Sequence, residues 1–177
     1  MDSENQKLGS KKRYAIGAAA VVFIAAIVWW TTGKSSDLSA TQLTDKYMSE
    51  VEGSPSTATG KGDENPLWLT AKQAYAKGDF ATAAKNIASI EEPNEGQIFY
   101  ESLSLMYQKP PDLDKASAGF VLLMRRNINF RDESRWFYTL IALKKGEKEA
   151  AVSMLQNVIG QRNAYSEKAA TLLKKLK

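Results

Sequence analysis

The sequence of 177 residues contains no cysteine and no histidine. Disulfides are therefore excluded, and zinc, copper and haem sites lose their usual ligands. A Ser-His-Asp triad, a Cys-His pair and histidine proton shuttling near neutral pH are excluded as well. Carboxylate and Ser-Lys chemistry remain open, so these absences disfavour an enzyme without deciding the matter.

Two carboxylate pairs, Asp112 with Asp114 and Glu91 with Glu92, are the remaining candidates for catalysis. Both pairs stand at predicted helix starts or in loops, where acidic residues favour the helix dipole. The sequence also lacks a phosphate-binding loop and a nucleotide-binding fingerprint. We therefore expect no enzyme activity, no catalytic residue, no metal site, no cofactor and no small-molecule substrate.

An uncharged stretch of twenty residues lies between Arg13 and Lys34. A helix of this length crosses the ~30 Å hydrocarbon core of a bilayer, and Tyr14, Trp29 and Trp30 suit its two interfaces. Basic residues are concentrated before the stretch, which predicts a cytoplasmic N-terminus. We therefore expect a cytoplasmic tail over residues 1–13 and a transmembrane helix over residues 14–33. The chain would then be a single-pass protein of the inner (cytoplasmic) membrane, with its C-terminal domain in the periplasm of a Gram-negative bacterium.

Cleavage of this segment as a signal peptide is the main alternative. The nearest small-x-small site is Leu38-Ser39-Ala40, in which Leu38 is too large and which lies well beyond Trp30. A lipoprotein anchor would need a cysteine. The uncleaved anchor is the favoured interpretation.

Residues 34–65 have the composition of a linker, and the Gly, Ser and Thr residues from Gly53 to Pro66 predict a flexible tether. Within it, Leu43, Tyr47 and Val51 are spaced by four, which predicts a short amphipathic helix. One interpretation is a transient helix or a small patch that docks on the following domain. The other is a peptide that engages a partner near the membrane.

A helical repeat occupies residues 66–177. Residues 67–90 align with residues 135–159, so that Gly78 and Gly146 are 68 residues apart, twice a period of 34. A degenerate middle unit covers residues 97–124, with Ala116 at the position of Ala83 and Ala151. A period of 34 with two helices per unit predicts stacked helical hairpins.

The repeats resemble tetratricopeptide repeats (TPRs), in which an aromatic residue, a small residue, a tyrosine and a Gly-Asp turn precede a small alanine. The residues that carry this resemblance in the first unit are Trp68, Ala71, Tyr75, Gly78, Asp79 and Ala83. The whole chain is similar to small bacterial proteins with an N-terminal anchor and a few exported TPRs. The resemblance implies an all-α fold, with an α-solenoid of about three TPR-like hairpins after the transmembrane helix. Residues 166–177 would form a C-terminal capping helix.

In the TPR family, the first helix of each hairpin lines a concave surface where protein partners dock. The resemblance therefore implies nine candidate protein-binding residues on this surface: Trp68, Lys72, Tyr75, Tyr100, Ser104, Tyr107, Trp136, Leu140 and Leu143. Aromatic residues at these positions also pack between helices, so core packing and partner contact both remain open for each of them.

Four arginines, Arg125, Arg126, Arg131 and Arg135, gather at the junction of the second and third repeats. They either bind an anionic partner through bidentate bonds or pair with Asp132, Glu133 and other nearby acids, and the second interpretation is favoured. The net charge is +4, and half of it precedes the predicted anchor. The rest of the chain is nearly neutral, so no nucleic-acid partner is expected.

Together these features predict a membrane-anchored scaffold, or an assembly or accessory subunit of a cell-envelope complex, whose partners are other proteins. The alternative is a chaperone-like protein at a translocon, or a regulatory signalling protein.

Overall fold

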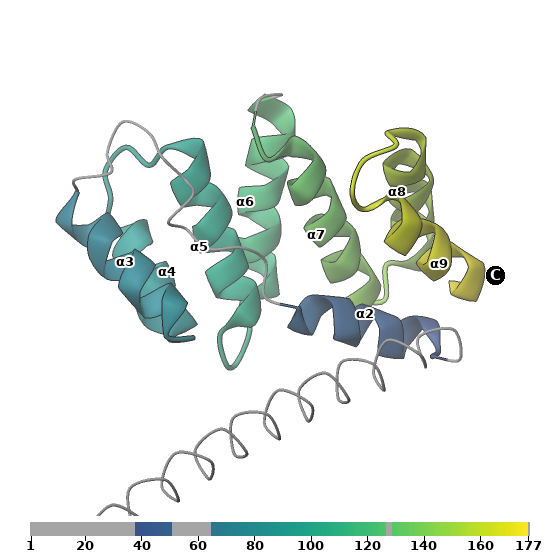
Figure 1. Cartoon of the computed structure of the whole chain (residues 1–177), viewed down its shortest axis with the longest axis horizontal. Helices are drawn as coiled ribbons and strands as arrows, with labels where there is room; N and C mark the ends of the chain where they lie inside the picture. Colours follow the sequence, from purple (N-terminus) through teal and green to yellow (C-terminus); the bar gives the residue numbers. More distant parts are fainter. Residues whose placement is uncertain (1–37, 51–64, 127–128, 177) are drawn as a thin grey trace, which may run out of the picture. The chain divides into compact units, whose positions relative to one another are not determined.

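The computed structural model describes residues 38–50, 65–126 and 129–176. Within these ranges the secondary structure is entirely α-helical, which confirms the predicted all-α class. The described helices belong to one compact unit, Ser39–Lys177 (Figure 1). Their bounds are α2 Ala40–Ser49, α3 Pro66–Ala76, α4 Phe80–Ala88, α5 Glu95–Tyr107, α6 Leu113–Arg126, α7 Arg131–Lys144, α8 Lys148–Gly160 and α9 Ser166–Leu176.

Side-chain caps and left-handed glycines set the helix ends. Asn65 caps α3 directly before Pro66, a residue suited to the first helical turn because it lacks the amide hydrogen. Asn94 caps α5 in a reciprocal box with Gln97. Gly78 and Gly146 have φ values of +75° and +80°, a conformation that glycine adopts without steric cost, and each lies in the turn between two helices. The repeated glycines predicted these two turns correctly.

The helices from α3 to α9 pack mainly on their neighbours in the chain. Three hairpins form, α3 with α4, α5 with α6 and α7 with α8, and α9 packs on α8. Contacts of α4 with α5 and of α6 with α7 join successive hairpins. This arrangement is consistent with an α-solenoid. The three alanines expected at close helix contacts, Ala83, Ala116 and Ala151, are completely buried.

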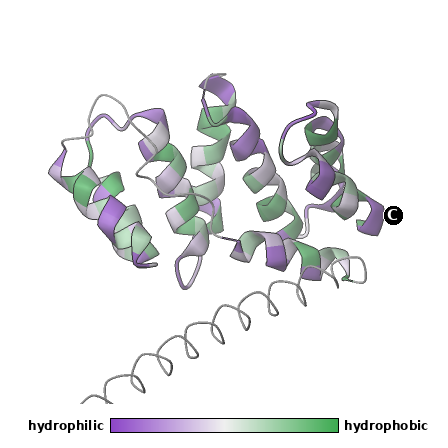
Figure 2. Ribbon diagram, viewed as in Figure 1, coloured by the Kyte–Doolittle hydropathy of each residue, from purple (hydrophilic) through white to green (hydrophobic). Residues whose placement is uncertain are grey.

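Aromatic and aliphatic side chains fill the contacts between hairpins. Hydrophobic residues recur along the helices from α3 to α9, interleaved with polar ones (Figure 2). Phe120 stacks on Phe137 with ring centroids 5.7 Å apart, and Phe99 lies 6.0 Å from Phe120. These three rings connect α5, α6 and α7 in one core.

Within the described part of the chain, no helix is both long and apolar enough to cross a bilayer. The predicted transmembrane helix, residues 14–33, and the predicted cytoplasmic tail, residues 1–13, lie outside the described residues. So does most of the predicted flexible tether, because residues 51–64 are not described.

Candidate functional site

Helix α2 packs mainly on helices that are distant from it in the sequence. Its main contacts are with α7 and α9, and it also touches α5 (Figure 1). Helices α5 and α7 are the first helices of their hairpins, and α9 follows the last hairpin. The short helix predicted between residues 41 and 51 is therefore a docked element of the compact unit, which begins at Ser39.

The sequence of α2 explains both its start and its buried side. Ser39 and Gln42 form a reciprocal capping box, which satisfies two backbone amides at the first turn. Leu43, Thr44 and Tyr47 are buried, and their spacing of one and four residues places them on one side of the helix. The Thr44 hydroxyl donates to the Ala40 carbonyl at 2.8 Å, so this polar group is satisfied within the helix.

The centre of the contact is aromatic. The ring centroids of Tyr47 and Trp136 are 5.5 Å apart, with an interplanar angle of 58°. On α7, Trp136 also stacks on Tyr165 at 5.5 Å with an angle of 18°. The Lys168 Nζ lies 5.3 Å from the centroid of the Tyr47 ring, within the range of a cation–π contact.

Polar contacts surround this aromatic centre. Lys144 Nζ donates to the Asp45 carboxylate at 2.6 Å, and Lys168 Nζ donates to the Glu50 carboxylate at 2.8 Å. The Tyr107 hydroxyl donates to the backbone carbonyl of Glu50 at 2.8 Å. We call Tyr107, Trp136, Lys144 and Lys168 the α2-binding face.

Apolar burial contributes more to this docking than the ion pairs do. The side chains of Lys144 and Asp45 are 45% and 50% exposed, and pairs this accessible contribute about 0–1 kcal/mol each. Burying a leucine side chain contributes about 1.5–3 kcal/mol, and Leu43 is completely buried. Burial raises the pKa of the Tyr47 hydroxyl above its ordinary value, and the nearby Glu50 carboxylate raises it further. Tyr47 is therefore neutral at physiological pH and docks as an uncharged aromatic residue.

A cavity of about 370 Å³ remains beside the first half of α2. Ala40, Thr41, Thr44 and Asp45 line one side of it. The other side is formed by Leu143, Lys144, Gly146, Lys148 and Leu176. Helix α2 therefore leaves part of this surface unfilled.

The nine predicted protein-binding residues divide by burial. Six are buried: Trp68, Tyr75, Tyr100, Ser104, Trp136 and Leu140. Tyr75 and Tyr100 meet edge to face at 5.2 Å, and the Ser104 hydroxyl donates to the Tyr100 carbonyl. The other three, Lys72, Tyr107 and Leu143, are half-buried. Of the nine, Tyr107 and Trp136 contact α2, and Leu143 lines the cavity beside it.

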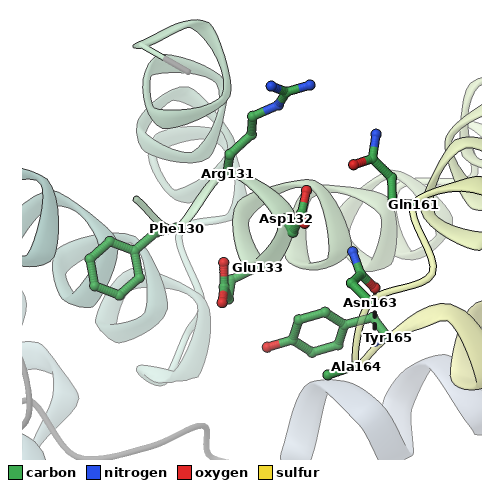
Figure 3. Close-up of a pocket in the computed structure, with 8 residues that line it drawn as sticks. All are labelled: Phe130, Arg131, Asp132, Glu133, Gln161, Asn163, Ala164 and Tyr165. Atoms are coloured by element: carbon green, nitrogen blue, oxygen red, sulfur yellow. Dashed lines mark hydrogen bonds between the residues drawn. The ribbon is translucent and has the colours of Figure 1, made fainter. Parts of the chain in front are cut away.

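The four predicted arginines lie at the end of α6 and the start of α7. Arg135 pairs with Asp132 at 3.1 Å within α7, as the favoured interpretation expected. Arg131 lies in a hollow of about 340 Å³ between the start of α7 and the loop before α9 (Figure 3). Figure 3 shows its side chain extending from the start of α7. Arg125 and Arg126 are exposed at the end of α6.

A groove of about 620 Å³ lies between α5, α6 and the loop before α5. Its lining includes Glu101, Leu105, Lys115 and Leu122, and Leu122 is 39% exposed. Burial raises the pKa of the Glu101 carboxyl above its ordinary value, and Lys115 lowers it in part. This groove mixes apolar and charged groups.

Sequence reasoning missed the two lysines of the α2-binding face. The spacing of Leu43 and Tyr47 indicated a helix with one apolar side, but no signal connects Glu50 with Lys168, which lie 118 residues apart. Among the described residues, no group of three or more Asp or Glu side chains is placed to hold a metal ion. No family model, curated protein or solved structure matches this chain.

Proposed function

We propose that this chain is a membrane-anchored protein-interaction scaffold, or an accessory subunit of a cell-envelope complex, built on a TPR-like α-solenoid. The observation that carries the proposal is that helices α5, α7 and α9 together hold another helix, α2. A surface that packs an amphipathic helix through an aromatic centre and flanking lysines has the chemistry of helix-in-groove recognition.

Binding accounts for these residues better than catalysis does. The chain has no histidine or cysteine, and the lysines of the α2-binding face are paired with the carboxylates of Asp45 and Glu50. The Tyr47 hydroxyl has a raised pKa, chiefly because of burial, which makes it a poorer proton donor. The face therefore offers shape, aromatic area and charge, which are the elements of protein recognition.

The proposal includes the anchor at residues 14–33, with the tail inside the cell and the helical unit exported. The absence of cysteine provides a clean test of this topology, because any introduced thiol is unique. Gln161→Cys, at an exposed position, should react with a membrane-impermeant maleimide in intact spheroplasts. Ser3→Cys should react only after lysis, and the reverse pattern would contradict the proposed orientation.

In-cell photo-crosslinking tests the scaffold itself. A photoreactive amino acid at Leu143, on the edge of the α2-binding face, should give discrete adducts with one or a few envelope proteins. The matched control is Lys85, an exposed residue on α4. A scaffold should also copurify with its partner at fixed stoichiometry. A broad smear of weak adducts would favour chaperone-like client binding, and the absence of adducts from both positions would overturn the proposal.

A further inference from the structure

We propose that α2 is a displaceable intramolecular ligand, and that the α2-binding face serves an acidic amphipathic helix of a partner protein that takes the place of α2. This inference rests on the proposed scaffold function and names the surface and the chemistry of the partner. Tyr47 and Leu43 are then occupants of a recognition site rather than permanent core residues.

The pattern of contacts distinguishes α2 from the other helices. From α3 onward, each helix packs mainly on the helix before and after it, whereas the main contacts of α2 are with α7 and α9 near the far end of the chain. The α3–α9 stack is therefore continuous without α2. Helix α2 is an addition to one face of that stack.

The contacts of α2 also make it easy to displace. It has ten residues, and isolated helices this short are marginally stable. Its ion pairs with Lys144 and Lys168 are partly exposed, and side chains of α2 leave the cavity beside Thr44 unfilled. The sequence from Gly53 to Pro66 predicts a flexible tether, which would let α2 leave while it stays attached.

The face defines the chemistry of the partner. An aromatic residue has to replace Tyr47 beside Trp136 and under Lys168, with an aliphatic residue one turn earlier at the position of Leu43. Carboxylates have to meet Lys144 and Lys168, as those of Asp45 and Glu50 do. The partner is thus a helix with an apolar residue, an aromatic residue four positions later, and acidic residues beside them.

Competition by α2 reduces the apparent affinity of such a helix. If the face is open only a fraction of the time, the apparent dissociation constant rises by the inverse of that fraction. Tethering places α2 at an effective concentration of order millimolar, so the closed form dominates until a partner accumulates or is itself held at the membrane. When α2 is prevented from docking, the face is always open, and the apparent dissociation constant of the partner helix falls to its intrinsic value.

A peptide of residues 38–51 labelled with fluorescein serves as the probe, and the full chain in lipid nanodiscs serves as the receptor. Leu43→Asp places a carboxylate in the apolar contact and should release α2. Ser49→Asp adds the same carboxylate at an exposed position of the same helix and should leave α2 docked. The probe should bind the Leu43→Asp chain at least tenfold more tightly than the wild type or the Ser49→Asp chain. A probe that itself carries Leu43→Asp should not bind.

A covalent lock gives a second arm that leaves the four residues of the α2-binding face unchanged. Thr41→Cys and Lys148→Cys introduce two thiols at exposed positions on the two sides of the cavity beside α2, and a bismaleimide can join them. The locked chain should lose binding of the probe and the in-cell adducts at Leu143. The same variant capped with N-ethylmaleimide should retain both.

Three results would overturn the inference. The first is equal affinity of the probe for the wild-type, Ser49→Asp and Leu43→Asp chains, and the second is undiminished probe binding by the locked chain. The third is a wild-type dimer that dissociates when Leu43→Asp is introduced. The last result would identify a second copy of this chain as the occupant. Probe binding requires no cellular partner, so a positive peptide result without in-cell adducts would count against the scaffold function and leave the helix-binding face standing.

Discussion

The phenol ring of Tyr47 packs against the indole of Trp136, with ring centroids 5.5 Å apart. One ring comes from the first described helix and the other from the third hairpin of the stack. Aromatic pairs of this kind contribute about 0.5–1.5 kcal/mol beyond their area of burial. This contact therefore makes the docking of α2 sensitive to a single side chain.

Tyr47→Ala should release α2 without unfolding the helices from α3 to α9. The substitution removes the pair with Trp136 and the burial of a large side chain, a loss of about 1.5–3 kcal/mol of docking free energy. Trypsin cleavage after Lys46 reports the release, because a docked helix protects that bond. Cleavage should accelerate by at least tenfold while far-UV circular dichroism changes little.

The control for this substitution is Ser49→Ala, which alters an exposed side chain of the same helix. Its cleavage rate should match that of the wild type within a factor of about two, since exposed substitutions change stability by about 0.5 kcal/mol or less. If Tyr47→Ala instead lowers the whole melting transition together with the cleavage protection, α2 and the stack form one cooperative unit.

Local signals made the helices themselves predictable. Gly78 and Gly146 are separated by two repeat periods, and each takes the left-handed conformation that ends a helix. Asn94 and Gln97 form a capping box that can be read from the sequence alone. These features depend on residues within a few positions of one another, which is the range over which sequence patterns are informative.

The charge pair between Lys144 and Asp45 gives a second prediction. Lys144→Asp should weaken α2 docking by about 0.5–1 kcal/mol, because two carboxylates would then face each other at a partly exposed site. Adding Asp45→Lys should restore most of the protection of the Lys46 bond. The restoration should shrink in high salt, where the Debye length falls to about 3 Å at 1 M.

Lys148→Asp is the matched control for this charge reversal, because Lys148 lines the cavity beside α2. Its effect on cleavage after Lys46 should be smaller than that of Lys144→Asp. Equal effects of the two reversals would indicate that α2 is held by the overall positive charge around the cavity and not by the specific pair of Lys144 with Asp45.

The surface on which α2 docks could not be predicted from the sequence. The aromatic residues assigned to a binding surface, such as Tyr75 and Tyr100, are buried because they fill the contact between the first two hairpins. The residues that hold α2 become neighbours only when the stack forms, since Lys168 and Glu50 come from opposite ends of the described chain. Long-range pairing of this kind depends on the geometry of the whole unit.

A close approach of α5 and α6 gives a third prediction. A Cβ atom added at Gly119 would lie 2.1 Å from the Ser102 Oγ and 3.4 Å from its Cβ. Gly119→Ala should therefore destabilise the unit by about 1–3 kcal/mol, the usual cost of overpacking. Adding Ser102→Ala removes the clashing oxygen and should recover most of that loss in denaturant unfolding. Additive losses in the double variant would show that the helices separate instead.

The carboxyl of Glu101 gives the last prediction, which concerns pH. Burial between α5 and α6 raises its pKa, so the folded state binds a proton more tightly than the unfolded state does. Folding stability from this group is therefore greatest below the ordinary glutamate pKa of about 4.3 and declines as pH rises through the higher folded value. Glu101→Gln removes the charged form and should raise the melting temperature at pH 7, with the gain shrinking toward zero near pH 3. A constant gain across this range would exclude titration of Glu101 as the cause.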